Sequence, residues 1–206
     1  MLKSEHSNVQ LPRLVLASAS PRRAEILESV GWEFVKALPE IDETEREGES
    51  PEDYVVRLAV EKAGAIAAGF PRDTVLGADT TVVIDRRIIG KPRDLDEARA
   101  MLRSLSGRWH EVLTGVAVFG ERGHRSGLQR TRVKFSEMDD GEVAFLAERG
   151  DPLDKAGGYA VQAQAALFIE GIEGDYWNVV GLPISLVYRL VNELTGGRSE
   201  PAATSG

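Results

Sequence analysis

The sequence predicts an α/β fold in which strands and helices alternate along one chain. Its 206 residues are 42% hydrophobic, which is enough to bury a substantial core in one α/β domain or two small lobes. The apolar run Leu14-Val15-Leu16-Ala17 is followed directly by a serine-containing turn and by a helix start at Pro21. Stretches with strand-like and helix-like periodicity then alternate as far as a closing helix that begins at Pro183.

The first predicted strand, turn and helix (residues 14–30) outline a phosphate cradle. Ser20 suits an N-cap and Pro21 the first helical position, so free backbone N–H groups should face the turn that also carries Ser18. Arg22 and Arg23 then lie at the pole of the helix where the macrodipole disfavours a cation by about 0.3–1 kcal/mol each. Either an anion offsets this cost, or the stretch is a surface helix with solvated arginines.

The next elements bring carboxylates close to a helix. Residues 32–37 are predicted to form a strand after Gly31, and an acidic loop over 41–45 follows it. Ser50 and Pro51 then open a helix that reaches about residue 68 and contains Lys62. Glu43 and Lys62 can be solvated groups of a soluble loop and helix, but a divalent cation would use one or two such carboxylates together with substrate phosphates.

An apolar run over 75–84 is interrupted by Gly77-Ala78-Asp79-Thr80 and leads through a turn at 85–87 into a hairpin. An ionised carboxylate such as that of Asp79 is costly among apolar neighbours unless it is paired or binds a metal. Asp79 is therefore either a general base or Mg²⁺ ligand at a strand end, or an aspartate that ends a strand and caps a turn. Lys91, in Gly90-Lys91-Pro92, is either aimed at a phosphate or an ordinary hairpin lysine.

The second half of the chain continues the alternation. Asp94 and Glu97 form a capping-box pattern, and the segment Asp154 to Gln162 combines glycines, an aromatic side chain and an amide, as a loop that reads a flat heterocycle would. The expected elements are a helix over 94–105, strands over 111–119 and 130–136, a short helix from 139, a turn-rich segment over 150–158, a strand over 165–172 and the helix from 183.

Composition excludes several classes of protein. A net charge of −8 argues against wrapping nucleic acid, and the absence of cysteine excludes disulfides and thiolate sites. No membrane span or signal peptide is recognisable, so we expect a cytoplasmic protein with no membrane partner. The histidines His6, His110 and His124 are too far apart in the sequence for a metal-binding pattern, and we assign them no role.

Taken together, the motifs resemble the Maf family of nucleoside triphosphate pyrophosphatases, in the same order and over nearly the whole chain. The resemblance rests on Ser18-Ala-Ser20-Pro-Arg22-Arg23, Gly77-Ala-Asp79-Thr80, Gly90-Lys91-Pro92, Asp154-Lys-Ala-Gly157-Gly158-Tyr159-Ala-Val-Gln162 and Asn178-Val-Val-Gly181-Leu-Pro183. It implies an elongated mixed sheet with flanking helices, two lobes around a cleft, and a relation to the inosine triphosphatase fold. We expect an extension over 1–12, one two-lobed domain over 13–195 and a disordered tail over 196–206.

The resemblance also implies an activity and roles for particular residues. The reaction would be hydrolysis of dTTP and UTP, or of modified pyrimidine nucleotides, to the monophosphate and pyrophosphate with Mg²⁺, Mn²⁺ or Co²⁺. Asp79 becomes the proton acceptor, without excluding direct metal ligation beside Glu43. Arg23, Lys62 and Lys91 match further active-site positions, Arg22, Thr80 and Gln162 are tied to base preference, and Ser18 and Ser20 join the substrate-binding set.

Two alternatives to this function stay open. One is a pyrophosphatase for modified or deaminated purine nucleotides, and the other is a regulator of cell division that senses a nucleotide without hydrolysing it. Each has a small-molecule nucleotide as its partner, and the sequence leaves a homodimer open.

Overall fold

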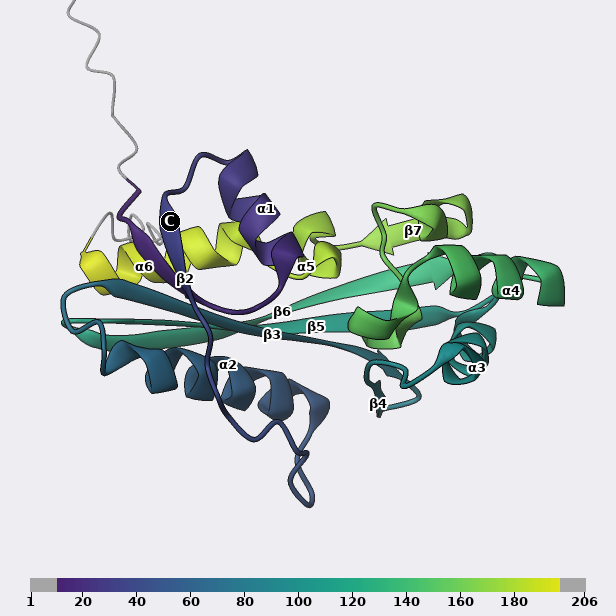
Figure 1. Cartoon of the computed structure of the whole chain (residues 1–206), viewed down its shortest axis with the longest axis horizontal. Coiled ribbons are helices and arrows are strands. Elements are labelled where there is room, and N and C mark those ends of the chain that lie inside the picture. The colour runs from purple at the N-terminus through teal and green to yellow at the C-terminus, as the bar shows by residue number, and fades with distance from the viewer. Residues whose placement is uncertain (1–10, 197–206) are drawn as a thin grey trace, which may run out of the picture.

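The computed structural model describes residues 11–196, and the expected extension and tail lie largely outside this range. Its centre is one mixed sheet of seven strands with the order β2-β1-β3-β5-β6-β7, in which β4 pairs with β3 beside this path. The α/β prediction is therefore confirmed (Figure 1). The strands are β1 (Leu14–Ala17), β2 (Phe34–Ala37), β3 (Thr74–Ile84), β4 (Arg87–Ile89), β5 (Trp109–Gly120), β6 (Gly123–Phe135) and β7 (Ile169–Glu173).

Helices cover both faces of the sheet. In Figure 1, α2 lies along one face of β3 and β5, and α1, α5 and α6 lie on the opposite face. The helices are α1 (Pro21–Ser29), α2 (Pro51–Ala67), α3 (Leu95–Leu105), α4 (Asp140–Arg149), α5 (Tyr176–Val180) and α6 (Ile184–Thr195), with short 3-10 turns η1 (Pro152–Asp154), η2 (Ala156–Gly158) and η3 (Gln164–Leu167). Within residues 11–196, no helix has both the length and the apolar character needed to cross a bilayer.

Two of the four hydrophobic clusters lie at opposite ends of the long strands and define two lobes. One core joins β1, the first half of β3 and the apolar faces of α1 and α6, and includes Leu16, Leu27 and Leu190. The other joins the far ends of β3, β5 and β6 to α3 and α4, and includes Leu102, Phe135 and Leu146. The long strands β3 and β5 run through both lobes, so they fix the distance between them (Figure 1).

Two glycines let α2 approach the sheet closely. A Cβ atom on Gly77 would lie 2.4 Å from the Ala59 carbonyl oxygen, and one on Gly115 would lie 2.1 Å from that of Val55. Both distances are far shorter than van der Waals contact, so only glycine admits the helix backbone here. Residues 77–80, which interrupt the apolar run of the sequence, continue β3 without a break and pair with β5.

Two predicted strands differ from the structure in their bounds, and one helix was missed. The strand expected over 165–172 begins only at Ile169, because Gln164–Leu167 form a 3-10 turn. The strand expected over 130–136 begins at Gly123 and pairs with β5 from Gly123 to Lys134. Its first residues are polar and exposed, so they lack the apolar alternation on which the prediction depended. The short helix α5 was not expected from the sequence.

Candidate active site

The cleft between the lobes lies where one edge of β3 has no strand partner. β1 pairs with β3 only as far as Gly77, and β4 joins the same edge from Val82 onward. Of the residues between them, Asp79, Thr80 and Thr81 line a cavity of about 720 Å³, which therefore receives side chains from both faces of the sheet. All ten residues predicted for the site line this cavity: Ser18, Ser20, Arg22, Arg23, Glu43, Lys62, Asp79, Thr80, Lys91 and Gln162.

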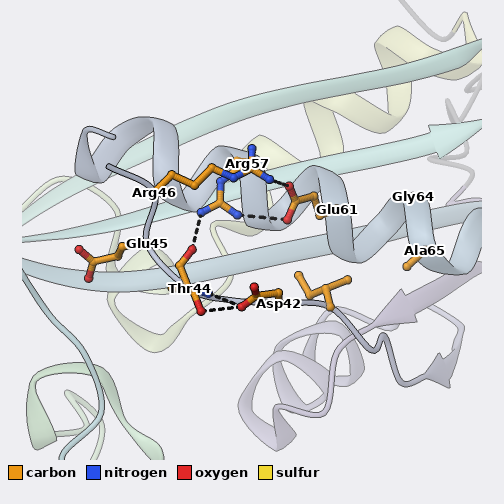
Figure 2. A pocket seen from close by; sticks show the side chains of 9 residues that line it. Asp42, Thr44, Glu45, Arg46, Arg57, Glu61, Gly64 and Ala65 are labelled. Atoms are coloured by element: carbon orange, nitrogen blue, oxygen red, sulfur yellow. Dashed lines mark hydrogen bonds and ion pairs between the residues drawn. The ribbon is translucent and has the colours of Figure 1, made fainter. Parts of the chain in front are cut away.

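A second hollow, of about 650 Å³, lies on the outer side of the loop that joins β2 to α2 (Figure 2). Its walls include Asp42, Thr44 and Glu45 from the loop, and Arg57 and Glu61 from α2. None of the ten predicted residues lines it. The predicted chemistry therefore belongs to the interlobe cavity, and the outer hollow borders the back of the same loop.

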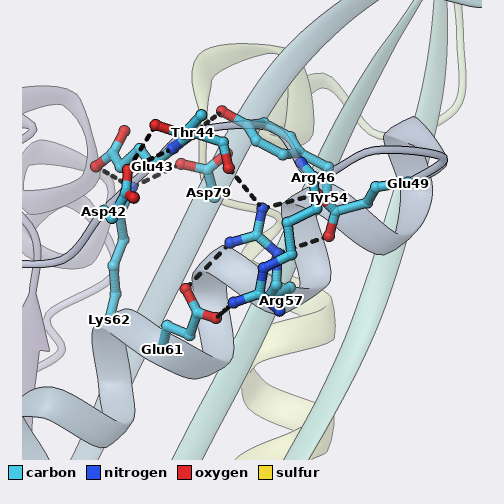
Figure 3. A network of polar contacts seen from close by, with 10 residues as sticks. All are labelled: Asp42, Glu43, Thr44, Arg46, Glu49, Tyr54, Arg57, Glu61, Lys62 and Asp79. Atoms are coloured by element: carbon cyan, nitrogen blue, oxygen red, sulfur yellow. Dashed lines mark hydrogen bonds and ion pairs between the residues drawn. The ribbon is translucent and has the colours of Figure 1, made fainter.

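Asp79 and Glu43 share one ammonium group (Figure 3). Lys62, on α2, lies 2.7 Å from Asp79 Oδ1 and 2.9 Å from Glu43 Oε1. Asp79 and Lys62 are each 8% exposed, whereas the Glu43 side chain is about half exposed. Burial raises the pKa of the Asp79 carboxyl, and Lys62 and Arg23 oppose that rise. The Asp79 carboxylate is thus in mid-strand, neither at the strand end nor in the turn that the sequence suggested.

Thr80 faces the opposite side of the sheet, where it meets Arg23. The buried Arg23 guanidinium donates to Thr80 Oγ1 at 3.1 Å, to Ser18 Oγ at 3.0 Å and to the Gly181 carbonyl at 2.9 Å. Burial lowers the pKa of Arg23, and the Asp79 carboxylate opposes this shift. Arg23 therefore joins α1 to β3 and to the turn after α5, beneath the cavity, and these contacts occupy all three guanidinium nitrogens.

The start of α1 follows the prediction in part. Ser20 occupies the N-cap and Pro21 the first turn, but the Ser20 side chain makes no capping hydrogen bond. Instead, the Ser20 amide donates to Ser18 Oγ at 3.2 Å. Since Ser18 also accepts from Arg23, its hydroxyl shapes the turn, and the first turn of α1 borders the cavity.

Arg22 reaches across the cleft to the other lobe. Its guanidinium lies 2.7 Å from Asp154 Oδ2 and also donates to the Asp154 carbonyl. Asp154 in turn binds Lys155 at 2.6 Å, and the Lys155 side chain is 10% exposed. One ion-pair chain therefore links the first helix to the loop that carries Gln162. Lys91 and Gln162 are exposed residues of the cavity wall.

Several residues of the site were not assigned from the sequence. Tyr54 lies two helical turns before Lys62 on α2, so its helical spacing from Lys62 would have placed it on the same wall. Asp154, Lys155 and Tyr159 lie inside the motif ending at Gln162, but no role was given to them. The Tyr159 hydroxyl contacts Nε2 of His110 at 2.7 Å.

His110 has a role that the sequence did not indicate, because it supports a cavity-lining tyrosine from a buried position. It is 2% exposed, and burial lowers its pKa from 6.5 to about 4, so the imidazole is neutral near pH 7. His124 lies on the exposed β5–β6 hairpin, stacked on Phe119, and His6 lies outside the described residues.

The donor set around Asp79 is compatible with a hard divalent cation. Among residues 11–196, no three carboxylate or histidine side chains converge as a complete metal site. However, Glu43 and Asp79 already bind one cation, the Lys62 ammonium, in common. Two carboxylates completed by substrate phosphate oxygens are the usual arrangement for Mg²⁺. Burial raises the pKa of Tyr54, and the Asp79, Glu43 and Glu45 carboxylates add to that rise.

The fold and the cleft together define a two-lobed α/β protein whose interlobe cavity combines arginine and lysine side chains with buried and exposed carboxylates. The family model described as Maf-like protein matches residues 13–194, and this chain belongs to that family.

Comparison with known proteins agrees with this assignment. A protein of Symbiobacterium thermophilum named dTTP/UTP pyrophosphatase is 46% identical over 90% of this chain and 94% of its own length. Proteins with the same name from Myxococcus xanthus and Hahella chejuensis are each 49% identical, over 86% and 88% of this chain and 90% and 92% of theirs. The solved structure of the Staphylococcus aureus Ham1 protein shares the fold, with a TM-score of 0.51 and 14% identity over 88% of this chain and 98% of that one.

Proposed function

We propose that this protein hydrolyses dTTP and UTP to the nucleoside monophosphate and pyrophosphate. The observation that carries the proposal is the convergence of cations from distant segments on one cavity that also contains a buried carboxylate. Arg22, Lys62, Lys91 and Lys155 come from α1, α2, the segment after β4 and the 3-10 turns, and all line it. The relatives that are 46–49% identical over most of this chain, and carry that substrate pair in their names, support it.

The cations suit a triphosphate that accumulates charge as pyrophosphate leaves. Arg22 and Lys91 line the cavity, and the first turn of α1 borders it with its backbone N–H groups. Such preorganised donors stabilise developing negative charge by about 3–4 kcal/mol per well-placed group. Arg23 contributes indirectly, because its hydrogen bonds to Ser18 and Thr80 hold the turn before α1 against strand β3.

In this proposal Asp79 is the general base. Its carboxylate takes a proton from a water molecule whose oxygen attacks the α-phosphorus, while the bond from that phosphorus to the bridging oxygen of pyrophosphate breaks. Burial raises the pKa of this carboxyl above that of a solvated aspartate, which increases its proton affinity. Lys62 donates to Oδ1 and so fixes the orientation of the carboxylate.

A divalent cation held by Glu43, and in part by Asp79, is a further part of the proposal. When bound, it would neutralise phosphate charge and polarise the attacked phosphorus. The residues present fit this role, since their oxygens already share one cation. Because Lys62 holds that place, its ammonium would have to move toward the phosphates when the metal site fills.

Base preference is proposed to depend on Gln162. Its amide carries one donor group and one acceptor, which match adjacent positions on the edge of thymine or uracil. The Thr80 hydroxyl, which the sequence suggested as a second reading group, is engaged by Arg23, Thr114 and the Gly181 carbonyl. Rejection of cytosine is therefore better assigned to a backbone amide of the 158–162 segment.

The test is pyrophosphate release from a panel of pyrimidine, purine and deaminated purine nucleotides with Mg²⁺, Mn²⁺ and Co²⁺. Preference for dTTP and UTP, with oxygen from ¹⁸O-water found in the monophosphate, supports the proposal. Preference for deaminated purines, or nucleotide binding without turnover, would overturn it. Asp79→Asn should nearly abolish turnover while nucleotide still binds, and turnover near the parent rate would exclude Asp79 as the base.

The proposed compartment of the protein is the cytoplasm. A homodimer is a further part of the proposal, and light scattering of the purified protein tests it.

A further inference from the structure

The loop that carries Glu43 is long and has no helix or strand of its own. It covers residues 38–50, between β2 and α2. Glu43 is the residue of this loop whose carboxylate reaches Lys62 in the cavity. A loop of this length is held by its side-chain contacts, since it has no backbone ladder to fix it. The groups that anchor it therefore decide where the Glu43 carboxylate lies.

Arg57 anchors the loop to α2 from the outer side (Figure 3). Its Nε and Nη2 lie 2.6 and 2.7 Å from the two carboxylate oxygens of Glu49, a bidentate pair. Nη2 also donates to the Thr44 carbonyl at 3.1 Å, next to Glu43 in the chain. The Arg57 and Glu49 side chains are only 12% and 9% exposed, so solvent screens this pair weakly.

The anchor continues to Glu43 itself through Tyr54. The Arg57 guanidinium lies over the Tyr54 ring, 5.5 Å from its centroid. The Tyr54 hydroxyl donates to the Glu43 carbonyl at 3.0 Å. Glu61, one turn after Arg57, holds the guanidinium at 3.1 Å and also binds Arg46 of the loop. The polar contacts of Arg57 therefore fall into two groups: those with Glu49 and Thr44 bind the loop, and those with Glu61 and Tyr54 orient the guanidinium.

We infer that Arg57, through its pair with Glu49, is a positioning residue for the reaction: it fixes the loop on α2 so that Glu43 faces Asp79 across Lys62. This inference rests on the proposed function. Arg57 does not line the interlobe cavity and so does not touch substrate there. Lysine cannot replace it, because an ammonium group lacks the planar fork that holds Glu49 with two bonds and reaches the Thr44 carbonyl as well.

The test is a double-mutant cycle on dTTP hydrolysis at saturating Mg²⁺. Arg57→Gln should lower kcat/KM by about 10- to 100-fold, the usual range for residues that support a metal-binding or catalytic side chain. In a Glu43→Gln background the same change should have little further effect, because Arg57 acts through Glu43. Equal losses in both backgrounds would overturn the inference.

A matched control comes from the other lobe. Arg99, on α3, also bridges two carboxylates, those of Asp96 at 2.7 Å and Glu148 at 2.9 Å, but it does not line the cavity and contacts no residue of the Glu43 loop. Arg99→Gln should leave kcat/KM within about twofold of the parent. A loss as large as that of Arg57→Gln would show that removing any bridging arginine has this effect, and would count against a specific role.

A second readout is independent of activity. Hydrogen exchange without nucleotide should accelerate in residues 42–49 of Arg57→Gln, where the amides of Thr44, Arg46 and Glu49 are hydrogen-bonded, and remain unchanged in α3 and α4. Unchanged exchange in the loop would overturn the inference. If the parent protein hydrolyses no nucleotide, the proposed function fails, and exchange still tests the anchor. If Arg57→Gln does not fold, Glu49→Gln removes the same ion pair while keeping Arg57 and its contact with the Thr44 carbonyl.

Discussion

Replacing Lys62 with methionine should create a binding site for Mn²⁺ at the place where two carboxylates now share the lysine ammonium. The substitution keeps an unbranched side chain of similar length but removes the ammonium that Asp79 and Glu43 share at 2.7 and 2.9 Å. Asp79 is then left buried without its closest partner. In the parent protein, Mn²⁺ must displace the ammonium before it can use both carboxylates, whereas in the variant it need not.

The size of the effect follows from burial. The Lys62 and Asp79 side chains are 10% and 11% exposed, and removing one partner of a buried pair costs about 3–5 kcal/mol. Glu43 is half exposed, so its share is small, about 0–1 kcal/mol. A domain of this size loses about 2–4 °C in Tm per kcal/mol. Lys62→Met in EDTA should therefore melt roughly 10 °C below the parent.

The assay is thermal unfolding with EDTA and with increasing Mn²⁺, in the absence of nucleotide. Mn²⁺ at a hundred times its Kd would restore about 2.7 kcal/mol to the variant. Lys155→Met is the matched control, since Lys155 is equally buried and also binds two carboxylates, those of Asp151 and Asp154. The reasoning is refuted if Mn²⁺ stabilises Lys62→Met no more than the parent, or if it stabilises Lys155→Met equally.

Three further predictions concern the base pocket, a buried base and the contact of α2 with the sheet. Gln162→Ala should reduce the preference for dTTP and UTP over CTP more than it reduces kcat, and equal losses in kcat/KM for every nucleotide would contradict a base-reading role. The pKa of His110 falls from 6.5 to about 4 on folding, so the unfolded chain binds more protons between these values. Stability is therefore retained above pH 6.5 and lost as the pH falls toward 4, by about 3 kcal/mol from this group. Urea unfolding of His110→Gln should show a shallower fall over that range, and an unchanged slope would refute the assignment. Gly115→Ala places a Cβ 2.1 Å from the Val55 carbonyl oxygen and should cost about 1–3 kcal/mol in urea unfolding, whereas Gly171→Ala meets only ordinary contact at 3.5 Å. Equal costs for the two glycines would show that α2 tolerates displacement.

Local signals predicted most of the elements correctly. Ser50 accepts from the Asp53 amide at 3.1 Å and begins α2 as expected, and α4 begins after Asp139, where a short helix was expected. These signals need only neighbours within one helical turn. Where pairing with a distant strand decides the outcome, the prediction failed: the first half of β6 is polar and exposed, and only its register with β5 makes it a strand.

The motifs also predicted the members of the site better than their arrangement. All ten predicted residues line one cavity, but each guanidinium nitrogen of Arg23 already donates to a protein group, including the Gly181 carbonyl, and Arg22 crosses the cleft to Asp154. The hexapeptide that contains both arginines does not predict the contact of Arg23 with Gly181 or that of Arg22 with Asp154. Each of these contacts depends on a segment 158 or 132 residues away. The anchor of the Glu43 loop through Arg57 also carries no motif of its own. Its partners Glu49 and Thr44 lie only 8 and 13 residues away, but their contact depends on how the irregular loop folds back onto α2.

The sequence by itself determined which side chains this protein can use, where most helices begin, and that the chain would form an α/β fold, since these follow from residue chemistry and short-range periodicity. Only the tertiary structure decided that Asp79 and Thr80, which point to opposite faces of β3, serve the same cavity. They do so because β1 ends at Gly77 and β4 begins to pair only at Val82, which leaves residues 78–81 open at the sheet edge. Strand endings of this kind depend on contacts between segments far apart in the chain, and local periodicity carries no information about them.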